Sequence, residues 1–147
     1  MLKMTAKRVG LQISHGSSVV TFDTTRREYL SFQRAKPPSP DAEPDELSLD
    51  EVYIERRGQG WAARGGIEFC QLYRNSLQLR VSDSTARRLG EEHEFEITFK
   101  IGDDKYTQLR DMMRSVFRGQ TTFHEASNQP ILRSTESGEV PLEALSS

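Results

Sequence analysis

The sequence predicts an α+β domain in which a mostly antiparallel sheet of about seven strands packs against a C-terminal helix. Three observations point to this class. Short segments that alternate apolar and polar residues recur along the chain, and the clearest covers residues 95–101. Glycines and turn-forming residues separate these segments, as expected for strands joined by turns. One longer segment near the C-terminus instead repeats its apolar residues with helical spacing.

Three strands are expected in the N-terminal part of the chain. The segments that alternate there are 7–14, 17–23 and 29–34. In the first of them, Val9, Leu11 and Ile13 would share one face, and His15 would lie in the turn that follows. In the third, Leu30 and Phe32 would share a face.

The stretch from Val52 to Val81 is expected to hold the central strands. They are predicted at 52–55, 67–72 and 77–81. Between the first two, Gly58 and Gly60 would break the strand and the pair Gly65-Gly66 would make a second break, because glycine weakens strand interiors and accepts backbone angles that other residues avoid. The glycine-hinged loop would carry Trp61 and Arg64 to the edge of the sheet.

The C-terminal part is expected to hold a short helix, a strand and a longer helix. Ser82 to Thr85 offer an N-cap for a short helix that Gly90 ends. The strand over 95–101 follows, and Asp103 and Asp104 then favour the positive end of the last helix. The apolar stripe of that helix would consist of Tyr106, Leu109, Met112, Met113, Val116 and Phe117. We expect the strand and the longer helix to pack in one core. The residues buried together there would be Phe95, Ile97, Phe99, Leu109, Val116 and Phe117.

We expect one domain over residues 1–118 with an acidic, proline-rich loop at 36–50 inside it. Between Pro37 and Glu55 there are seven acidic residues and no Lys or Arg. Four prolines between 37 and 44 exclude a helix and a central strand there. Residues 119–147 are rich in Ser, Thr and Glu and would form a partly disordered tail.

Composition narrows the classes of function. A formal net charge of −2 argues against a protein that binds the phosphate backbone of nucleic acids, which is normally basic. No apolar run is long enough for a signal peptide or a membrane span, so we expect a cytoplasmic protein with no membrane partner. Cys70 is the only cysteine, which excludes a disulfide within one chain.

Residues that could support catalysis are isolated in the sequence. The three histidines, His15, His93 and His124, lack the spacing of metal ligands, and we interpret them as surface residues. Cys70 falls in a predicted central strand, where a small buried apolar residue is expected rather than a nucleophile. We therefore expect no catalytic residue, no metal and no cofactor.

The glycines also fit a loose dinucleotide-binding pattern, GxGxxA, at Gly58, Gly60 and Ala63. That motif needs a helix N-terminus to face the pyrophosphate. Here a strand is predicted to follow, so a glycine-hinged loop is the simpler interpretation.

Two charged features are candidates for binding a partner. Arg56, Arg57, Arg64 and Arg74 surround Trp61 and Tyr73 in the sequence. Interleaved arginines and aromatic residues occur in sites for single-stranded nucleic acid and in protein interfaces, and they also occur on solvated faces. The acidic loop could steer association with a basic protein, although charge runs in loops often serve only solubility. The candidate partner-binding residues are Glu43, Asp45, Glu46, Asp50, Arg56, Arg57, Trp61 and Arg64.

Several short motifs resemble the immunity protein 10 family. They are Tyr29-Leu30-Ser31-Phe32-Gln33-Arg34, Tyr53-Ile54-Glu55, Gly58 to Trp61, Gly65 to Glu68, Asn75-Ser76-Leu77 and Ala86 to Gly90. The resemblance extends to about Phe117, and it covers neither the proline-rich segment 36–44 nor the tail after Arg118. It implies a small bacterial protein that neutralises a cognate toxin encoded beside it.

Two hypotheses follow. The first is an immunity protein that inhibits a protein toxin by stoichiometric occlusion, without turnover, with a homo-oligomer possible. The alternative is a small nucleic-acid-binding or regulatory domain that uses the Arg-rich edge around Trp61. An enzyme is the weakest candidate, because its site would have to be assembled from scattered acids and single histidines.

Overall fold

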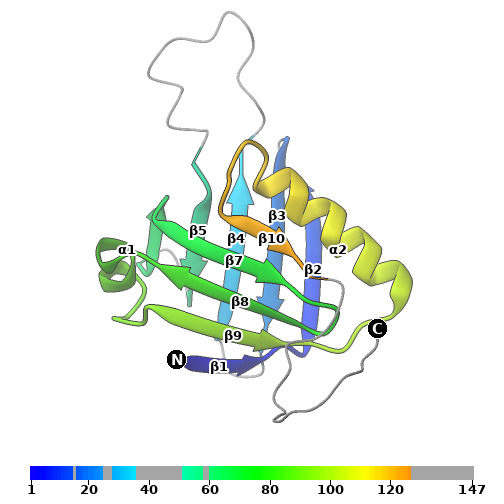
Figure 1. Cartoon of the computed structure of the whole chain (residues 1–147), viewed down its shortest axis with the longest axis horizontal. Helices are drawn as coiled ribbons and strands as arrows, with labels where there is room; N and C mark the ends of the chain where they lie inside the picture. The colour runs from blue at the N-terminus through cyan, green and yellow to red at the C-terminus, as the bar shows by residue number, and fades with distance from the viewer. Residues whose placement is uncertain (15, 25–27, 36–50, 58–59, 127–147) are drawn as a thin grey trace, which may run out of the picture.

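A computed structural model describes residues 1–14, 16–24, 28–35, 51–57 and 60–126. Within these residues, ten strands form two five-stranded sheets, and two helices accompany them (Figure 1). Sheet A has the strand order β1 (Leu2–Thr5), β9 (Glu94–Thr98), β8 (Ser76–Val81), β7 (Ile67–Leu72) and β10 (Phe123–Glu125). Sheet B has the order β2 (Arg8–Ser14), β3 (Ser17–Asp23), β4 (Tyr29–Arg34), β5 (Tyr53–Arg56) and β6 (Ala62–Arg64). The helices are α1 (Asp83–Arg88) and α2 (Asp103–Val116). No helix among the described residues has the length and apolar composition needed to cross a membrane.

The α+β class is confirmed, whereas the number and grouping of the strands differ from the prediction. The described residues hold ten strands rather than about seven, in two sheets rather than one. The additional strands β1, β6 and β10 have only three or four residues each, which is too short to show an alternation. In addition, β1 and β10 pair in parallel with β9 and β7, and such pairing leaves no local turn signal.

The chain passes from sheet B to sheet A at Gly65 and Gly66. Both have a positive φ, 75° and 81°, which L side chains rarely adopt. A Cβ on Gly66 would lie 1.9 Å from the hydroxyl oxygen of Thr85 in α1, so a side chain does not fit there. The glycine pair predicted as a break in the sheet is therefore the point at which the chain leaves β6 and enters β7.

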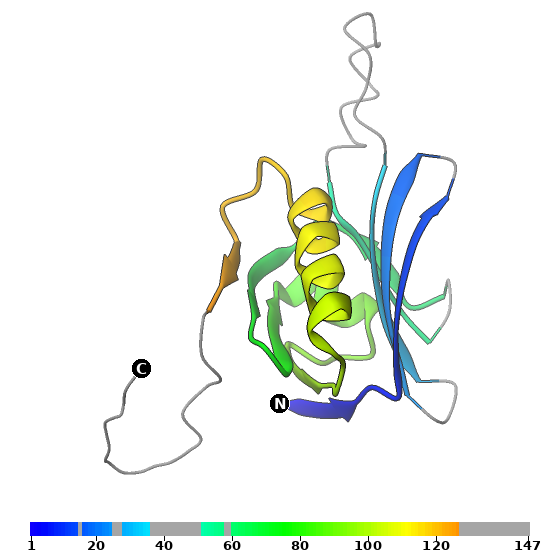
Figure 2. The same ribbon diagram turned by 90° about the vertical axis from the view of Figure 1, so that its right-hand side faces the viewer.

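The inner faces of the two sheets share one hydrophobic core (Figure 2). The six residues predicted to be buried together all belong to it, and that prediction is confirmed: Phe95, Ile97, Phe99, Leu109, Val116 and Phe117. The ring centre of Phe22 in β3 lies 5.8 Å from that of Phe99, and the ring centre of Phe32 in β4 lies 6.0 Å from that of Phe117. These contacts join sheet B to the chain on either side of α2.

Helix α2 lies against β2, β3 and β4 on the inner face of sheet B. Its Leu109, Met113 and Val116 are buried, as the predicted apolar stripe requires. Arg34, at the end of β4, is 4% exposed and donates from Nη1 to the backbone oxygens of Val116 at 2.9 Å and Arg118 at 3.2 Å. A cation at the C-terminal carbonyls of a helix is stabilising, so Arg34 fixes the end of α2 to sheet B.

The chain continues past the predicted domain boundary at 118 into β10. The Phe123 ring stacks on Phe117 with 5.1 Å between centres. Arg114 of α2 holds the carboxylate of Glu125 through two hydrogen bonds of 2.5 and 2.8 Å. The rest of the predicted tail, 127–147, and the predicted acidic loop, 36–50, lie outside the described residues.

Candidate functional site

Arg56, one of the candidate partner-binding residues, is buried and only 5% exposed. Its Nε and Nη2 donate to the carboxylate of Glu28 at 2.9 and 3.5 Å, and its Nη1 donates to the backbone oxygen of Leu89 at 2.7 Å. The guanidinium also lies 5.2 Å from the Trp61 ring centre and 5.6 Å from that of Phe95. Arg56 therefore connects sheet B to the end of α1 and to β9, which is a structural role.

Trp61 is partly buried and packs against the backbone that follows α1. Gly90 has a φ of 85°, and a Cβ there would lie 2.5 Å from Cζ3 of the tryptophan ring. The absence of a side chain at Gly90 lets the indole approach this closely. Trp61 is thus held by contacts within the chain, while part of its ring remains accessible.

Arg57 lies beside this cluster and reaches solvent, with its side chain 49% exposed. Its backbone has a φ of 65°, a strained conformation for a residue other than glycine. Its Nε donates to Glu28 at 2.7 Å, and its guanidinium lies 4.9 Å from the Trp61 ring centre. Partial burial acts to raise the pKa of Glu28, but the hydrogen bonds and charges of Arg56 and Arg57 outweigh it and hold that pKa below its usual range.

Arg64 is exposed on β6, the edge strand of sheet B. Its guanidinium lies 5.4 Å from the ring centre of Tyr53 on the neighbouring strand. Among the described residues it forms no ion pair. Of the three candidate arginines, Arg64 is the one with its charge most available to a partner.

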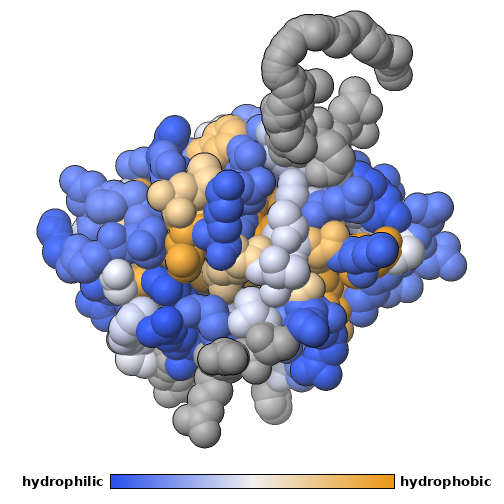
Figure 3. Space-filling model, turned by 90° about the horizontal axis from the view of Figure 1, so that it is seen from below, coloured by the Kyte–Doolittle hydropathy of each residue, from blue (hydrophilic) through white to orange (hydrophobic). Residues whose placement is uncertain are grey.

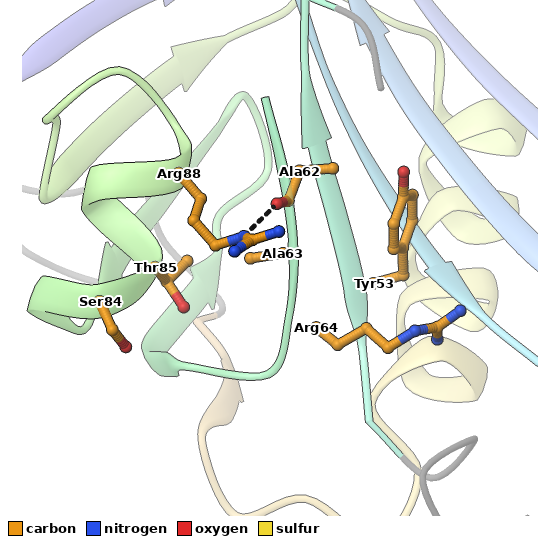
Figure 4. A pocket seen from close by; sticks show the side chains of 7 residues that line it. All are labelled: Tyr53, Ala62, Ala63, Arg64, Ser84, Thr85 and Arg88. Atoms are coloured by element: carbon orange, nitrogen blue, oxygen red, sulfur yellow. Dashed lines mark hydrogen bonds between the residues drawn. The ribbon is translucent and has the colours of Figure 1, made fainter. Parts of the chain in front are cut away.

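A shallow pocket of about 510 Å³ lies where α1 meets the β5–β6 pair (Figure 4). It is lined by Tyr53, Ala62, Ala63, Arg64, Ser84, Thr85 and Arg88, none of which is acidic. Arg88 reaches from α1 to the backbone oxygen of Ala62, with an Nε–O distance of 2.9 Å. Figure 4 shows Arg64 extending instead towards Tyr53, so the two guanidinium groups do not converge on one point.

The face of sheet B that points away from sheet A joins this pocket. We call it the outer face of sheet B. Cross-strand register places its side chains in rows, one of which is Arg64, Tyr53, Gln33, Val19 and Gln12. The next row is Ala62, Glu55, Ser31, Thr21 and Gly10. The third is Tyr29, Asp23 and Arg8. Figure 2 shows no helix or strand of the described residues covering this face.

Glu55 occupies the centre of the outer face of sheet B between two tyrosines. Tyr53 donates its hydroxyl to Oε1 of Glu55 at 2.8 Å, and Tyr29 donates to Oε2. Burial, followed by these hydrogen bonds, raises the pKa of both tyrosines. The Glu55 carboxylate is therefore held in place with its negative charge on the surface, flanked by aromatic rings.

The outer face of sheet A offers a contrasting arrangement. Arg80 lies 5.8 Å from the ring centre of Phe69, but its Nε also lies 3.6 Å from Oε1 of Glu68. His124 lies against Phe69 with 5.5 Å between ring centres.

Large apolar residues are exposed only singly among the described residues, at Met1 and Ile13. Figure 3 shows hydrophobic patches on the lower face that hydrophilic residues separate.

Three other residues discussed in the sequence analysis do not belong to the group of Arg64, Tyr53 and Glu55 on sheet B. Arg74, predicted beside Trp61, instead pairs with Asp103 at 2.7 Å and lies 4.9 Å from the ring centre of Tyr106. Cys70 is fully buried, and burial raises the pKa of its thiol, which agrees with the predicted apolar role. His93 donates from Nε2 to the carboxylate of Asp83 at 2.9 Å.

Other sequence predictions concern sites that the structure does not assemble or does not describe. No three His, Cys, Asp or Glu side chains among the described residues converge as metal ligands. Strand β6 contains Ala63 of the glycine pattern, so no helix begins there to face a phosphate. The acidic candidates, Glu43, Asp45, Glu46 and Asp50, lie outside the described residues, as do His15 and Gly58.

Tyr29, Glu55 and Arg88 were not among the candidate residues. The alternation of β4 and β5 would have placed Tyr29 and Glu55 on one face, but it does not show that these strands are neighbours. Arg88 reaches Ala62 only because α1 folds back onto β6, which no local pattern indicates.

Comparison with known proteins gives one assignment. No curated protein matches the chain. The sequence pattern of the family described as immunity protein 10 matches residues 5–107, which include all of sheet B, β7 to β9 and the start of α2. The match begins before the motifs quoted above and ends before Phe117. Because it covers well over half of the 147 residues, the chain belongs to the immunity protein 10 family.

Proposed function

We propose that this protein binds a cognate toxin in a stoichiometric complex and inhibits it by occlusion, without turnover, in the cytoplasm of the cell that encodes both. The family assignment supports the toxin–immunity role. The observation that carries the choice of surface is the exposed Arg64 beside the Tyr29–Glu55–Tyr53 group on the outer face of sheet B. We propose that this face and the adjoining pocket contact the toxin.

The chemistry of the outer face of sheet B suits a protein partner. Tyrosine and arginine are enriched in protein interfaces because they combine apolar area with hydrogen bonding. Glu55 can accept further hydrogen bonds from a basic side chain, and the pocket lined by Arg64 and Arg88 can receive an acidic one. The hydroxyl hydrogen bonds of Tyr29 and Tyr53 orient both rings before binding, which reduces the entropy cost of association.

The nucleic-acid alternative loses support from the geometry of the arginines. Arg56 is buried, Arg57 pairs with Glu28, and Arg74 pairs with Asp103. In the rows of described residues on the outer face of sheet B, Arg8 and Arg64 are matched by Asp23 and Glu55, and Arg88 in the adjoining pocket adds one positive charge. Among these described residues, a polyanion would therefore meet two carboxylates beside three guanidinium groups, and this near balance of charge favours a protein over a phosphate backbone.

The acidic segment 36–50 stays a prediction as a second contact. It joins β4 to β5, the two strands that carry Tyr29, Tyr53 and Glu55. Its acidic residues could steer association with a basic toxin, and neutralising Glu43, Asp45, Glu46 and Asp50 together should then slow association at low ionic strength, where screening is weak.

The test begins with the product of the neighbouring open reading frame. Co-expression should rescue growth from that toxin, and the two proteins should elute as one complex with a fixed ratio. Within this complex, Tyr53→Ala and Arg64→Ala should each weaken binding by about 2 kcal/mol, or roughly thirtyfold, if they are interface anchors. Stability should change little in Arg64→Ala, because its side chain is exposed.

The matched controls are Phe69→Ala and Arg80→Ala on the outer face of sheet A. That pair has the same stacked arrangement of an arginine on a partly buried aromatic ring. Normal affinity in the controls and reduced affinity in the test variants supports the proposed surface. The reverse pattern would place the toxin on sheet A, and the absence of any complex would reject the occlusion mechanism.

A further inference from the structure

The four edge strands of the two sheets are unequal. Among the described residues, β1, β10 and β6 have four, three and three residues, and the Ala62 carbonyl of β6 receives a hydrogen bond from Arg88. Strand β2 has seven residues and pairs with β3 in unbroken register from Arg8 to Ser14. It contains no proline and no bulge, and its only charged residue is Arg8 at its start. Soluble proteins usually guard such an edge, because its free N–H and C=O groups can pair with another strand.

Side chains of β2 on the core side become progressively less covered along the strand. Val9 is 3% exposed, Leu11 is partly buried, and Ile13 is 70% exposed. Ile13 lies opposite Ser18, whose hydroxyl contacts Ser115 of α2 at 3.1 Å, so Ile13 is on the face that packs against α2. A large apolar side chain therefore stands on the core side of an open edge with its surface in water.

The sequence of β2 is complementary to itself in an antiparallel pair. A two-fold axis through Leu11 pairs all seven residues of two copies and keeps core-side residues on one face. Leu11 then faces Leu11 of the second copy, and Val9 faces Ile13. Gly10 faces Gln12, and Arg8 faces Ser14. Apolar residues meet apolar residues in this register, and no like charges face each other.

We propose that β2 is the interface between two copies of this chain, joined antiparallel about Leu11 into a continuous ten-stranded sheet. In this pairing, the backbone N–H and C=O groups at the edge of β2 form hydrogen bonds with the second copy. Val9 of the second copy covers Ile13. An interface of this kind is isologous and closes after two subunits. It leaves the outer face of sheet B open in both copies, so the dimer is compatible with toxin binding and independent of it.

Sedimentation of the full chain tests the proposal. The protein should have twice the mass of the 16.8 kDa chain at micromolar concentration. Ile13→Lys should weaken the dimer by at least about a hundredfold, because each lysine would be placed against buried Val9 of the other copy. The control Gln12→Lys adds the same charge to an exposed neighbour on the opposite face of the strand and should leave the dimer intact.

A cross-linking variant tests the register itself. Opposite residues of an antiparallel pair have Cα atoms about 4.5–5.5 Å apart, within the range of a disulfide. Leu11→Cys should therefore form a disulfide-linked dimer on mild oxidation, whereas Gln12→Cys should not, because its partners would be diagonal neighbours about 7–8 Å apart. The native Cys70 is fully buried and should not contribute.

Four results would overturn the proposal, and the last two are cases of a monomeric full chain that also identify what uses the edge of β2 instead. One is a monomer at all accessible concentrations. Another is a dimer that survives Ile13→Lys, since it would use a different surface. A third is a monomeric full chain that dimerises after removal of residues 127–147, because the edge of β2 would then belong to the chain's own C-terminal segment. The fourth is a monomer in which Ile13→Lys abolishes binding of the toxin.

Discussion

The inner faces of the two sheets are both apolar, whereas their outer faces differ in how the charged side chains are paired. Each carries an exposed arginine stacked on a partly buried aromatic ring, Arg64 on Tyr53 in sheet B and Arg80 on Phe69 in sheet A. On sheet A, Arg80 forms an ion pair with Glu68. On sheet B, Arg64 forms no ion pair among the described residues, and the neighbouring carboxylate of Glu55 is held by tyrosine hydroxyls.

This difference is the reason for proposing the outer face of sheet B, rather than that of sheet A, as the binding surface. A charge that already has a partner gains little from a new contact, whereas an oriented group without an ionic partner can gain a charge-assisted hydrogen bond. The same distinction applies within sheet B. The Arg56 guanidinium is hydrogen-bonded in the interior, whereas Arg64 has no ion pair within the part of the chain that the structure describes. Residue type alone does not distinguish Arg56, Arg57 and Arg64.

The largest expected effect concerns the core that both sheets share. Phe99 is 5% exposed and packs on Phe22 of sheet B. Phe99→Ala should lower the free energy of unfolding by about 3–5 kcal/mol, because it leaves a cavity between the sheets. Urea denaturation monitored by Trp61 fluorescence gives this value, and an unchanged midpoint would mean that the two sheets do not share this core.

The next effect concerns Arg56, which links sheet B to α1 and β9. Arg56→Met keeps the volume of the side-chain stem but removes the hydrogen bonds to Glu28 and Leu89, and should cost about 3 kcal/mol. Arg57→Met is the matched control, because its more exposed pair with Glu28 should contribute at most about 1 kcal/mol. Equal losses in the two variants would contradict the assignment of a structural role to Arg56 alone.

A smaller effect is expected at the edge of sheet A. A chain ending at residue 120 lacks β10 and the contact of Phe123 with Phe117, and should lose about 1–2 kcal/mol. A chain ending at residue 126 keeps β10 and should unfold like the full-length protein. Both truncations should bind the toxin normally, because neither alters the outer face of sheet B. Equal stability of the two truncated chains would show that β10 adds nothing to the domain.

The smallest effect is the pH dependence that comes from Glu28. Because Arg56 and Arg57 hold its pKa below the ordinary value of 4.5, its contribution to stability is complete above that pH. The contribution is lost as the pH falls through the lowered pKa of the folded state. The free energy of unfolding of Glu28→Gln should therefore fall less steeply below pH 4.5 than that of the original protein. Parallel pH profiles would show that Glu28 has the same pKa in the folded and unfolded states.

Most elements could be predicted from the sequence because their signals are local. Alternation placed β2, β3 and β4, and helical spacing with two N-terminal aspartates placed α2. The division into two sheets could not be predicted, because Gly65 and Gly66 indicate a break but not the direction in which the chain continues. The short strands β1 and β10 are held by long-range parallel pairing that has no local pattern.

The candidate site was less predictable, because exposure depends on tertiary contacts. Arg56 and Arg57 are adjacent in the sequence, yet the first is buried by Trp61 and Phe95 and the second is half exposed. Alternation along β5 places Arg56 on the inner face with Ile54, which was a usable signal. Its ion pair with Glu28 joins residues 28 positions apart and could not be inferred.

The most direct test of the proposed surface is hydroxyl-radical footprinting of the protein alone and in complex with its toxin. Aromatic and histidine side chains on both outer faces report in one experiment. Tyr29 and Tyr53 should become protected on binding, whereas Phe69 and His124 on sheet A should react as they do in the free protein. Protection of Phe69 and His124 with unchanged reactivity of Tyr29 and Tyr53 would contradict the proposal that the toxin binds the outer face of sheet B.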